Sequence, residues 1–369
     1  MAGGAFAQQG SWDISGSASV ETKIDFDGDP LVAEGVSQGD HTNGGVDITY
    51  KLNGLTASIG FHAFGGISGS AEYEGDNYKF KVGGNLLEVD PAALNSSDVV
   101  AIGTVSPGDL WGYYKLVGGI VHLEAAWNGR GDSWWESDNT APDLIGGFDF
   151  GWGKLDGIDG VLVNIEIANL QAGVLAPHFF HTAASHDPDP AKILSGILNK
   201  VVVGFKIDMN PINFAAQFKA EDYGIYVGAE AKFAMLTFGI SFIGTFLNET
   251  NAAAGLKIQY DADPISAWIK VAMGLAGNPL ETSFIINPGF NYKVIPDYFW
   301  FGINSKFGIG NDAIDWYLNP KMGWNFRGSG ATDDPGTGFI IQYEVGKGNG
   351  AVGWSDVNQF SARFKWNFF

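Results

Sequence analysis

Histidine is the first residue type to consider as a catalyst, because many hydrolases pair a nucleophile with a histidine and a carboxylate or amide. Of the six histidines, only His62 and His122 fall in segments that predict strands, each on the more polar face. No Gly-x-Ser-x-Gly sequence accompanies them. Single histidines at such places more often line a wall than catalyse a reaction. We therefore expect no catalytic residue, no cofactor and no enzymatic activity.

A short acidic stretch, DFDGDP at 25–30, has the spacing that begins a calcium-binding loop, with Asp25, Asp27 and Asp29 at alternate positions. Such a loop needs a bidentate glutamate about eleven positions after the first aspartate. Val36 occupies that position here. An acidic turn is the favoured interpretation, and we predict no metal site.

Basic side chains form a larger chemical feature, because they recur at alternate positions of segments whose other positions are apolar. A polar face of this kind beside water would act on ions and polar solutes through its charge. Acidic residues occupy these polar positions about as often, so the net charge of −20 must lie mainly in the connections. The basic residues that we predict to line a polar wall are Lys23, Lys51, Lys79, Lys81, Lys206, Lys219, Lys232, Lys257, Lys270, Lys293, Lys306, Lys321, Arg363 and Lys365.

Residues 11–26, SWDISGSASVETKIDF, show the underlying pattern most clearly. From Trp12 to Phe26 every even position is apolar, small or threonine, and every odd position between them is polar. Successive side chains of a strand point to opposite faces, so this segment predicts a strand with one apolar and one polar face. A soluble sandwich would bury the apolar face, whereas a membrane barrel would turn it towards lipid.

The alternation continues to the end of the chain and predicts about twenty strands, or sixteen to eighteen if the weakest segments are not strands. Besides 11–26, the clear segments are 46–52, 55–64, 161–170, 201–209, 214–221, 225–233, 236–246, 254–261, 265–273, 284–294, 299–309, 314–326, 339–347 and 358–368. The weaker segments are 68–74, 78–86, 111–115, 120–127 and 148–153. Residues 191–198, which follow DPDP, predict one or two helical turns.

The predicted connections alternate between short and long. Gly, Asn and Pro mark tight turns, and these are 53–54, 75–77, 210–212, 261–264 and 295–297. Long connections are 27–45, 87–110, 128–146 and 171–199. Short turns at one end and long loops at the other are typical of a transmembrane β-barrel, with periplasmic turns and extracellular loops. Residues 327–338 do not fit, because they are long at the end that has tight turns.

Composition agrees with this fold class. Charged residues make up 17% of the chain, below the roughly 25% usual in soluble domains. No segment approaches about 18 uninterrupted apolar residues, so we predict no transmembrane helix. The acidic balance argues against nucleic acid as a partner. The chain has no cysteine, so neither a disulfide nor a thiolate metal site is available to it.

The N-terminal residues contain Ala5-Phe6-Ala7 followed by Gln8, the small-x-small pattern that ends a secretory signal peptide. We interpret residues 1–7 as the tail of a signal peptide or a remnant of cloning, and residues 8–369 as one barrel domain. A flexible beginning of the chain is an equally weighted alternative. The first interpretation predicts that the protein is exported.

Aromatic residues are concentrated near the ends of the apolar faces. In a membrane barrel they would form girdles at the two membrane interfaces. The core aromatics of a soluble β protein are the less favoured interpretation. The residues assigned to the girdles are Trp12, Phe26, Tyr50, Tyr73, Trp111, Trp127, Tyr260, Tyr292, Phe299, Trp324, Tyr343 and Trp366.

The whole chain resembles a bacterial outer-membrane porin. Its last predicted strand, NQFSARFKWNFF, is amphipathic and ends on Phe369, similar to the signal that the outer-membrane assembly machinery reads. The alternation closes on Phe368, one residue before the usual place. The N-terminal GGAFAQ is similar to spirochaete export signals. The resemblance implies an outer-membrane location and contact with lipid and with lipopolysaccharide or an equivalent. It also implies that a homotrimer is one possible assembly.

The same resemblance implies that the third outer loop folds into the barrel and narrows it. That loop is predicted to be 87–110, which contains the apolar run 99–102; such a run suits a loop packed on a wall, although an outward hairpin stays open as an alternative. The loop 171–199 is a second candidate. The acidic residues expected at the constriction are Glu88, Asp90, Asp98 and Asp109.

Size then predicts function. Twenty strands about 4.8 Å apart and tilted by about 40° give a backbone diameter of roughly 40 Å, which side chains cannot fill. We predict an all-β transmembrane antiparallel barrel that forms a weakly cation-selective channel for passive diffusion of small hydrophilic solutes. The alternative is a surface adhesin or structural barrel with a plugged lumen. Trp134 and Trp135 are compatible with sugar or receptor binding, although a packed loop tip is favoured.

Overall fold

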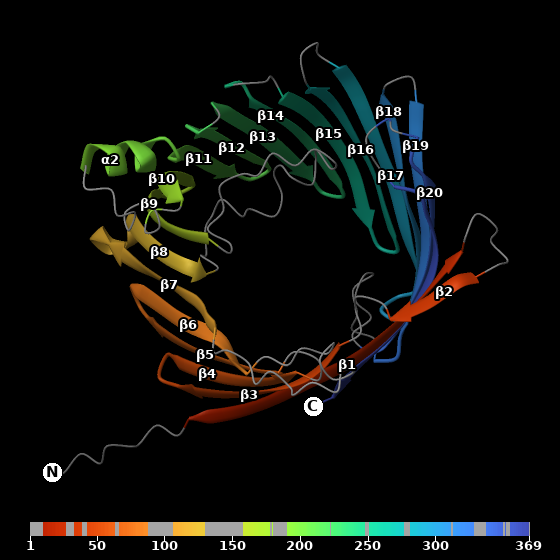
Figure 1. Ribbon diagram of the computed structural model, residues 1–369, viewed down its shortest axis with the longest axis horizontal. Coiled ribbons are helices and arrows are strands. Elements are labelled where there is room, and N and C mark those ends of the chain that lie inside the picture. Colours follow the sequence, from red (N-terminus) through yellow and green to blue (C-terminus); the bar gives the residue numbers. More distant parts are fainter. Residues whose placement is uncertain are drawn as a thin grey trace.

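The structure is a computed structural model of the 369-residue chain. It describes residues 10–26, 33–38, 43–62, 66–87, 106–129, 158–177, 179, 190–221, 223–247, 251–276, 281–310, 313–327, 337–349, 351 and 355–368. Almost all of these belong to strands of one antiparallel sheet that closes on itself (Figure 1).

The sheet contains 21 strand segments. They are β1 (Ser11–Phe26), β2 (Ala33–Gln38), β3 (Asn43–Leu52), β4 (Leu55–His62), β5 (Gly66–Gly75), β6 (Tyr78–Leu87), β7 (Ser106–Leu116), β8 (Val121–Gly129), β9 (Ile158–Ile167), β10 (Leu170–Pro177), β11 (Val202–Met209), β12 (Ile212–Lys219), β13 (Gly224–Phe233), β14 (Leu236–Thr245), β15 (Asn251–Ala262), β16 (Ile265–Ala276), β17 (Glu281–Ile295), β18 (Phe299–Gly310), β19 (Ala313–Asn325), β20 (Gly338–Lys347) and β21 (Val357–Phe368). The helical elements are η2 (Val117–Gly119) and α2 (Pro190–Leu198).

The segments β2 and β3 share one position in the ring. Residues 11–19 of β1 pair with β3, and residues 22–26 of β1 pair with β2. The other segments each take one position, which makes a closed barrel of 20 strands. The predicted strand number of 20 is therefore confirmed.

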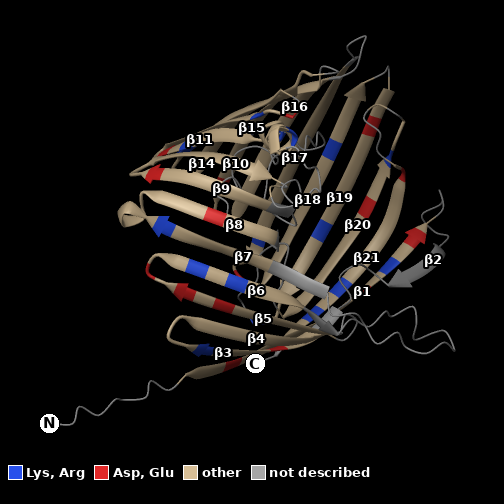
Figure 2. Cartoon of the chain, turned by 60° about the vertical axis from the view of Figure 1, so that its left-hand side comes forward, with Lys and Arg blue, Asp and Glu red and all other residues tan. Residues whose placement is uncertain are grey.

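The ring closes between the first and the last strand. Gly16 is paired with Phe368, and the register runs without a shift to Asp25 opposite Gln359. Figure 2 shows β1 and β21 side by side. The N-terminal end of β1 lies at the edge of the barrel that carries the short turns, because Ser11 is paired with Lys51 next to the β3–β4 turn. The C-terminal end of β21 lies towards the same edge, because Phe368 is paired with Gly16. The alternation of the last strand closes on Phe368, as predicted, and Phe369 lies outside the described residues.

The two edges of the barrel differ in their connections. At the short-turn edge, Asn53 and Gly54 both have positive φ, at 45° and 81°, as a two-residue hairpin of type I′ requires. At the opposite edge, β6 and β7, β8 and β9, and β10 and β11 are separated by long stretches. Residues 326–337 remain the exception that the sequence indicated, and a hydrogen bond from the Phe326 N–H to the Thr337 carbonyl (2.8 Å) closes that loop at its base.

Most predicted strands are confirmed to within a few residues, and α2 confirms the predicted helix. The prediction of a loop at 171–199 was wrong at its beginning, because residues 170–177 form β10. The loop 27–45 likewise contains β2 and the first residues of β3. The loop 87–110 is shorter than predicted, because β7 begins at Ser106.

The weak strand prediction at 148–153 falls outside the described residues. β8 pairs directly with β9, from Val121 opposite Ile165 to Gly129 opposite Ile158. No further strand therefore lies between these two in the barrel. The predicted number was correct because this segment was counted in place of β10.

Candidate pore wall

In a soluble protein apolar side chains are buried and polar ones are exposed, whereas in this sheet many apolar side chains are exposed and many polar ones are buried. In β1, Val20 is 58% exposed whereas its neighbour Glu21 is 3% exposed. The same inversion recurs around the ring, because Ile240, Leu256 and Ile303 on other strands are each at least 40% exposed. An apolar outer band with polar groups turned inward is stable only when lipid covers the outside, and a closed barrel satisfies the strand backbone there. The chain therefore has the fold of an outer-membrane β-barrel.

All fourteen predicted basic residues lie on the inner face of the wall. Register supports this placement, since Lys81 faces Trp111 and Glu72, and Arg363 faces Glu21, all of them inner-face positions. Figure 2 shows basic and acidic positions interspersed along the strands. That solutes pass over these residues stays a prediction.

Ion pairs between neighbouring side chains offset part of the inner charge. Distances from the lysine Nζ to a carboxylate oxygen are 3.3 Å for Lys79 and Glu72, 3.1 Å for Lys206 and Asp208, 3.5 Å for Lys219 and Glu221, 3.3 Å for Lys257 and Glu230, and 3.1 Å for Lys293 and Asp263. Paired charges of both signs create a field along the wall that is locally strong and has little net sign.

Glycines on the inner face provide room for the large side chains of the next strand. A Cβ on Gly289 would lie 2.0 Å from the ring of Trp268, and one on Gly323 would lie 2.6 Å from the ring of Trp300. Each indole therefore occupies the space that a side chain on the neighbouring strand would need. Lys321 Nζ lies 5.6 Å from the ring centroid of Trp300, within the range of a cation–π contact.

Amides and a carboxylate form a hydrogen-bonded group on β19 and β20. The Asn319 amide donates to Glu344 Oε1 (3.1 Å) and to the Tyr317 hydroxyl (3.1 Å), and the Gln342 amide donates to the same Glu344 oxygen (3.2 Å). Glu344 is thus held by neutral donors on the inner face. This group was not predicted from the sequence, because a neutral amide contrasts less strongly with its apolar neighbours than a lysine does.

One part of the inner face is apolar. Trp111, Ala126, Leu162, Leu175 and Val202, which we call the inner apolar cluster, lie on the inner faces of β7 to β11 and are all below 5% exposed. The assignment of Trp111 to an outer girdle was therefore wrong. Its odd-numbered neighbours Tyr113 and Lys115 share its face, and the outer face of β7 is formed by residues such as Leu110 and Tyr114.

The other predicted girdle residues are on the outer face. Trp12 and Tyr50 have ring centroids 4.7 Å apart, and Phe299 and Trp324 have centroids 5.3 Å apart. Both pairs lie near the short-turn edge, where strands end. Such clusters suit a membrane interface, because aromatic rings prefer that depth.

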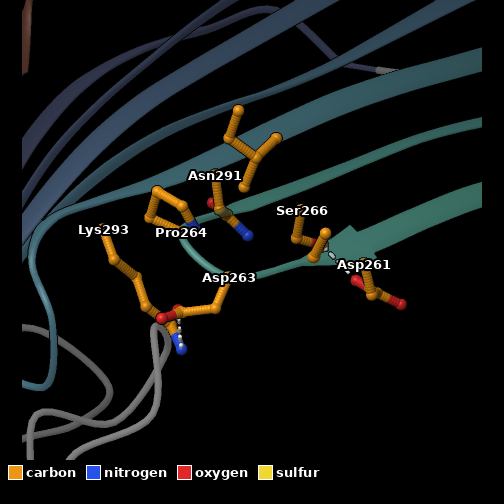
Figure 3. A pocket seen from close by; sticks show the side chains of 8 residues that line it. Asp261, Asp263, Pro264, Ser266, Asn291 and Lys293 are labelled. Atoms are coloured by element: carbon orange, nitrogen blue, oxygen red, sulfur yellow. Dashed lines mark hydrogen bonds and ion pairs between the residues drawn. The ribbon is translucent and has the colours of Figure 1, made fainter. Parts of the chain in front are cut away.

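A hollow of about 270 Å³ lies at the short-turn edge, around the β15–β16 turn (Figure 3). Lys293 reaches Asp263 across its mouth, and the Ser266 hydroxyl donates to Asp261 Oδ1 at 2.6 Å. Asp261 also accepts from the Gln259 amide at 2.6 Å. The rim of the barrel therefore carries an ion pair and a hydrogen-bonded carboxylate around this hollow.

The two histidines and the acidic stretch that the sequence singled out do not form a shared site in the described residues. His62 Nε2 lies 2.9 Å from the Ser68 hydroxyl, and His122 Nε2 lies 4.0 Å from Glu124 Oε2, so the two histidines have different surroundings. Asp25 accepts a hydrogen bond from the Gln359 amide (2.5 Å). Within the described ranges, no group of three or more acidic or histidine side chains could hold a metal ion.

Three of the four acids predicted at the constriction, Glu88, Asp90 and Asp98, lie outside the described residues, as do Trp134 and Trp135. Asp109 belongs to β7 and not to a loop, which corrects its predicted setting. None of the helices in the described part of the chain is long and apolar enough to cross a membrane.

Comparison with known proteins gives structural likeness alone. No protein-family model matches the chain, and no curated protein matches it. OccAB3 of Acinetobacter baumannii is 9% identical, with 96% of this chain and 100% of that chain covered and a TM-score of 0.48. The outer membrane channel DcaP of the same species is 10% identical, with 97% of each chain covered and a TM-score of 0.44. The trimer form of OmpT, an outer membrane protein of Vibrio cholerae, is 13% identical, with coverage of 97% and 99% and a TM-score of 0.38.

Proposed function

We propose that the chain is a porin, a water-filled channel in a bacterial outer membrane through which small hydrophilic solutes and ions diffuse passively. The observation that carries this proposal is the charged inner face. Lysines from β1 to β21 and the acids paired with them face the barrel axis, where neighbouring charges and water in the lumen are the groups that could solvate them. A barrel whose interior was filled by its own wall would need apolar or neutral side chains there.

The width of the barrel supports the same proposal. Twenty positions about 4.8 Å apart, tilted by about 40°, give a backbone diameter of roughly 40 Å. Side chains reaching inward from both sides leave a wide space at the axis. Outer loops must narrow that space for the channel to be selective, and residues 88–105 remain our candidate because of their apolar run and their three acids.

The proposed setting follows from the outer face and the last strand. The apolar band would contact membrane lipid, with lipopolysaccharide or an equivalent in the outer leaflet. The amphipathic last strand, β21, would engage the barrel assembly machinery. A homotrimer is the assembly that we would test first, by cross-linking in native membranes.

Single-channel conductance in a planar bilayer tests the function. The refolded, heat-modifiable barrel should insert as discrete current steps whose size scales with salt concentration. A correctly folded barrel that inserts without current would contradict the proposal. A boiled sample, which loses the barrel, is the control for contaminating channels.

The alternative function is a surface adhesin or structural barrel with a blocked lumen, and one observation favours it. The inner apolar cluster is shielded from water although it lies on the inner face, with Leu162, Leu175 and Val202 at 0% exposure. A lumen filled entirely by water would leave these side chains wet. Blocked conductance together with binding of a host or bacterial ligand to the outer loops would favour this alternative.

A further inference from the structure

Asp315 is a carboxylate with no exposure on the inner face of the barrel. It lies on β19 opposite Gly308 of β18, near the long-loop edge, and its neighbour Ile314 is 55% exposed on the outer face. A carboxylate hidden from water in this way must be held by hydrogen-bond donors. The segment that supplies these donors is therefore fixed in place by Asp315.

Two donors to Asp315 come from the connection between β20 and β21. The backbone N–H groups of Asn349 and Ala351 both donate to Asp315 Oδ1, the second at 3.2 Å. The Asn349 side-chain amide donates to the Ile314 carbonyl at 2.6 Å. Charge-assisted bonds of this kind are stronger than those between neutral groups, so they can fix a short segment. We call Gly348, Asn349 and Ala351 the hook.

The direction of the hook is unexpected. The strands β20 and β21 are neighbours, so a connection between them needs only to turn back. The Ala351 carbonyl instead lies 2.7 Å from the position of a Cβ on Gly310 of β18, and the Ser283 Cβ of β17 lies 3.2 Å from the same point. The hook therefore crosses β19 to reach β18, away from β21, a path of roughly 10 Å across the wall.

The two positions that place Asn349 and Ala351 over β18 and β19, Gly310 and the Asp315 side chain, face the barrel axis, while Gly348 donates its N–H to Asp356 at 2.8 Å. Gly310 and Asp315 share the inner face of β18 and β19, and Ala351 is 4% exposed. A glycine is required at position 310, because a side chain there would meet the backbone of the hook. We propose that Asp315 is a positioning residue that holds the hook inside the mouth of the barrel, where the hook narrows the pore beside β17 to β19.

Cross-linking tests the position of the hook without relying on conduction. The chain has no cysteine, so the pair Ser283→Cys and Ala351→Cys can be introduced cleanly. A short thiol-reactive cross-linker should join the two in folded barrels, and Asp315→Ala in the same background should abolish most of the product. The control pair, Ser283→Cys with Tyr223→Cys on a distant connection, should not react. Absence of the first product, or a product that survives Asp315→Ala, would overturn the proposal.

Conductance tests the consequence, which rests on the proposed channel function. Asp315→Ala and Gly310→Ala should both raise single-channel conductance, and by a similar factor, because they release the same segment from different strands. Gly83→Ala is the matched control, since a Cβ on this inner-face glycine would meet only ordinary contacts, the nearest at 3.4 Å. Unchanged conductance in both variants of a conducting barrel would refute the narrowing. If the parent barrel does not conduct, the porin proposal fails, and the cross-link alone decides whether Asp315 anchors the hook.

Discussion

Lys257 on β15 and Glu230 on β13 meet across the whole width of the strand that separates them. Their Nζ and Oε2 atoms are 3.3 Å apart, and both side chains are nearly hidden, at 12% and 9% exposure. Gly239 of β14 is the direct register partner of both residues. Because Gly239 has no side chain, the lysine and the glutamate can extend over it and make contact. This contact therefore connects three consecutive strands, β13, β14 and β15.

Lys257→Met should destabilise the barrel, because it leaves the carboxylate of Glu230 in a nearly buried place without its closest cation. The expected loss in the free energy of unfolding is about 1–3 kcal/mol, between the values for exposed and fully buried pairs. Reversible urea unfolding in lipid vesicles measures it. Lys232→Met is the control, since Lys232 is exposed near the end of the same inner face of β13, and it should have little effect.

The double variant Lys257→Met with Glu230→Gln provides the second check. It removes both charges, so much of the lost stability should return. A double variant as unstable as Lys257→Met alone would show that packing over Gly239, and not charge, accounts for the loss.

Leu256→Arg tests which face meets lipid. Leu256 is 44% exposed on the outer face near the middle of β15. A charge there should cost about 2–4 kcal/mol of stability in a bilayer. Gln259→Arg, on the inner face of the same strand, should cost far less, since the Asp261 carboxylate already lies 2.6 Å from this side chain. Equal effects of the two substitutions in the vesicle unfolding assay would contradict the inside-out assignment.

The sequence predicted most strands because most of the wall separates polar from apolar groups. Val20 and Glu21 fall on opposite faces, and the alternation in residues 11–26 records this directly. The same logic placed the lysines, because most of them, such as Lys257 between Leu256 and Ile258, occupy a position between outward apolar residues. Strand number and closure followed from repetition of this pattern.

The strand β10 was missed for a physical reason. Its sequence, LQAGVLAP, has apolar residues on both faces, since Leu175 faces inward while Leu170 and Val174 face outward. Trp111 was misplaced for the same reason. Both belong to the inner apolar cluster, where the inner face is covered and alternation disappears. The hook could not be predicted either, because the bonds between Asp315 and residues 349 and 351 depend on three-dimensional register.

Deletion of residues 92–102 should raise the single-channel conductance, because we expect this part of the third outer loop to occupy the lumen. The deletion leaves β6 and β7 intact, since they end at Leu87 and begin at Ser106. Heat-modifiable migration on gels confirms that the barrel has folded. Conductance equal to that of the parent would show that the loop projects outward.

The channel should prefer cations weakly, because the net charge of −20 lies mainly outside a nearly balanced wall. Acids of the outer connections should attract cations only within about a Debye length, ~10 Å at 0.1 M salt and ~3 Å at 1 M. The preference should therefore decline as salt rises. The acids in question are Asp27, Asp29, Asp40, Asp132, Glu136 and Asp138, all outside the described residues.

Glu88→Gln combined with Asp90→Asn should reduce this selectivity more than the same number of changes among the outer acids. The reason is that a charge at the narrowest point acts on every passing ion, although facing lysines offset part of it. Asp132→Asn with Asp138→Asn is the matched control for net charge. Reversal potentials across a KCl gradient measure the permeability ratio. Clear anion preference in the parent would show that lysines such as Lys257 and Lys270, which are direct partners on the inner face, determine the selectivity instead of the acidic connections.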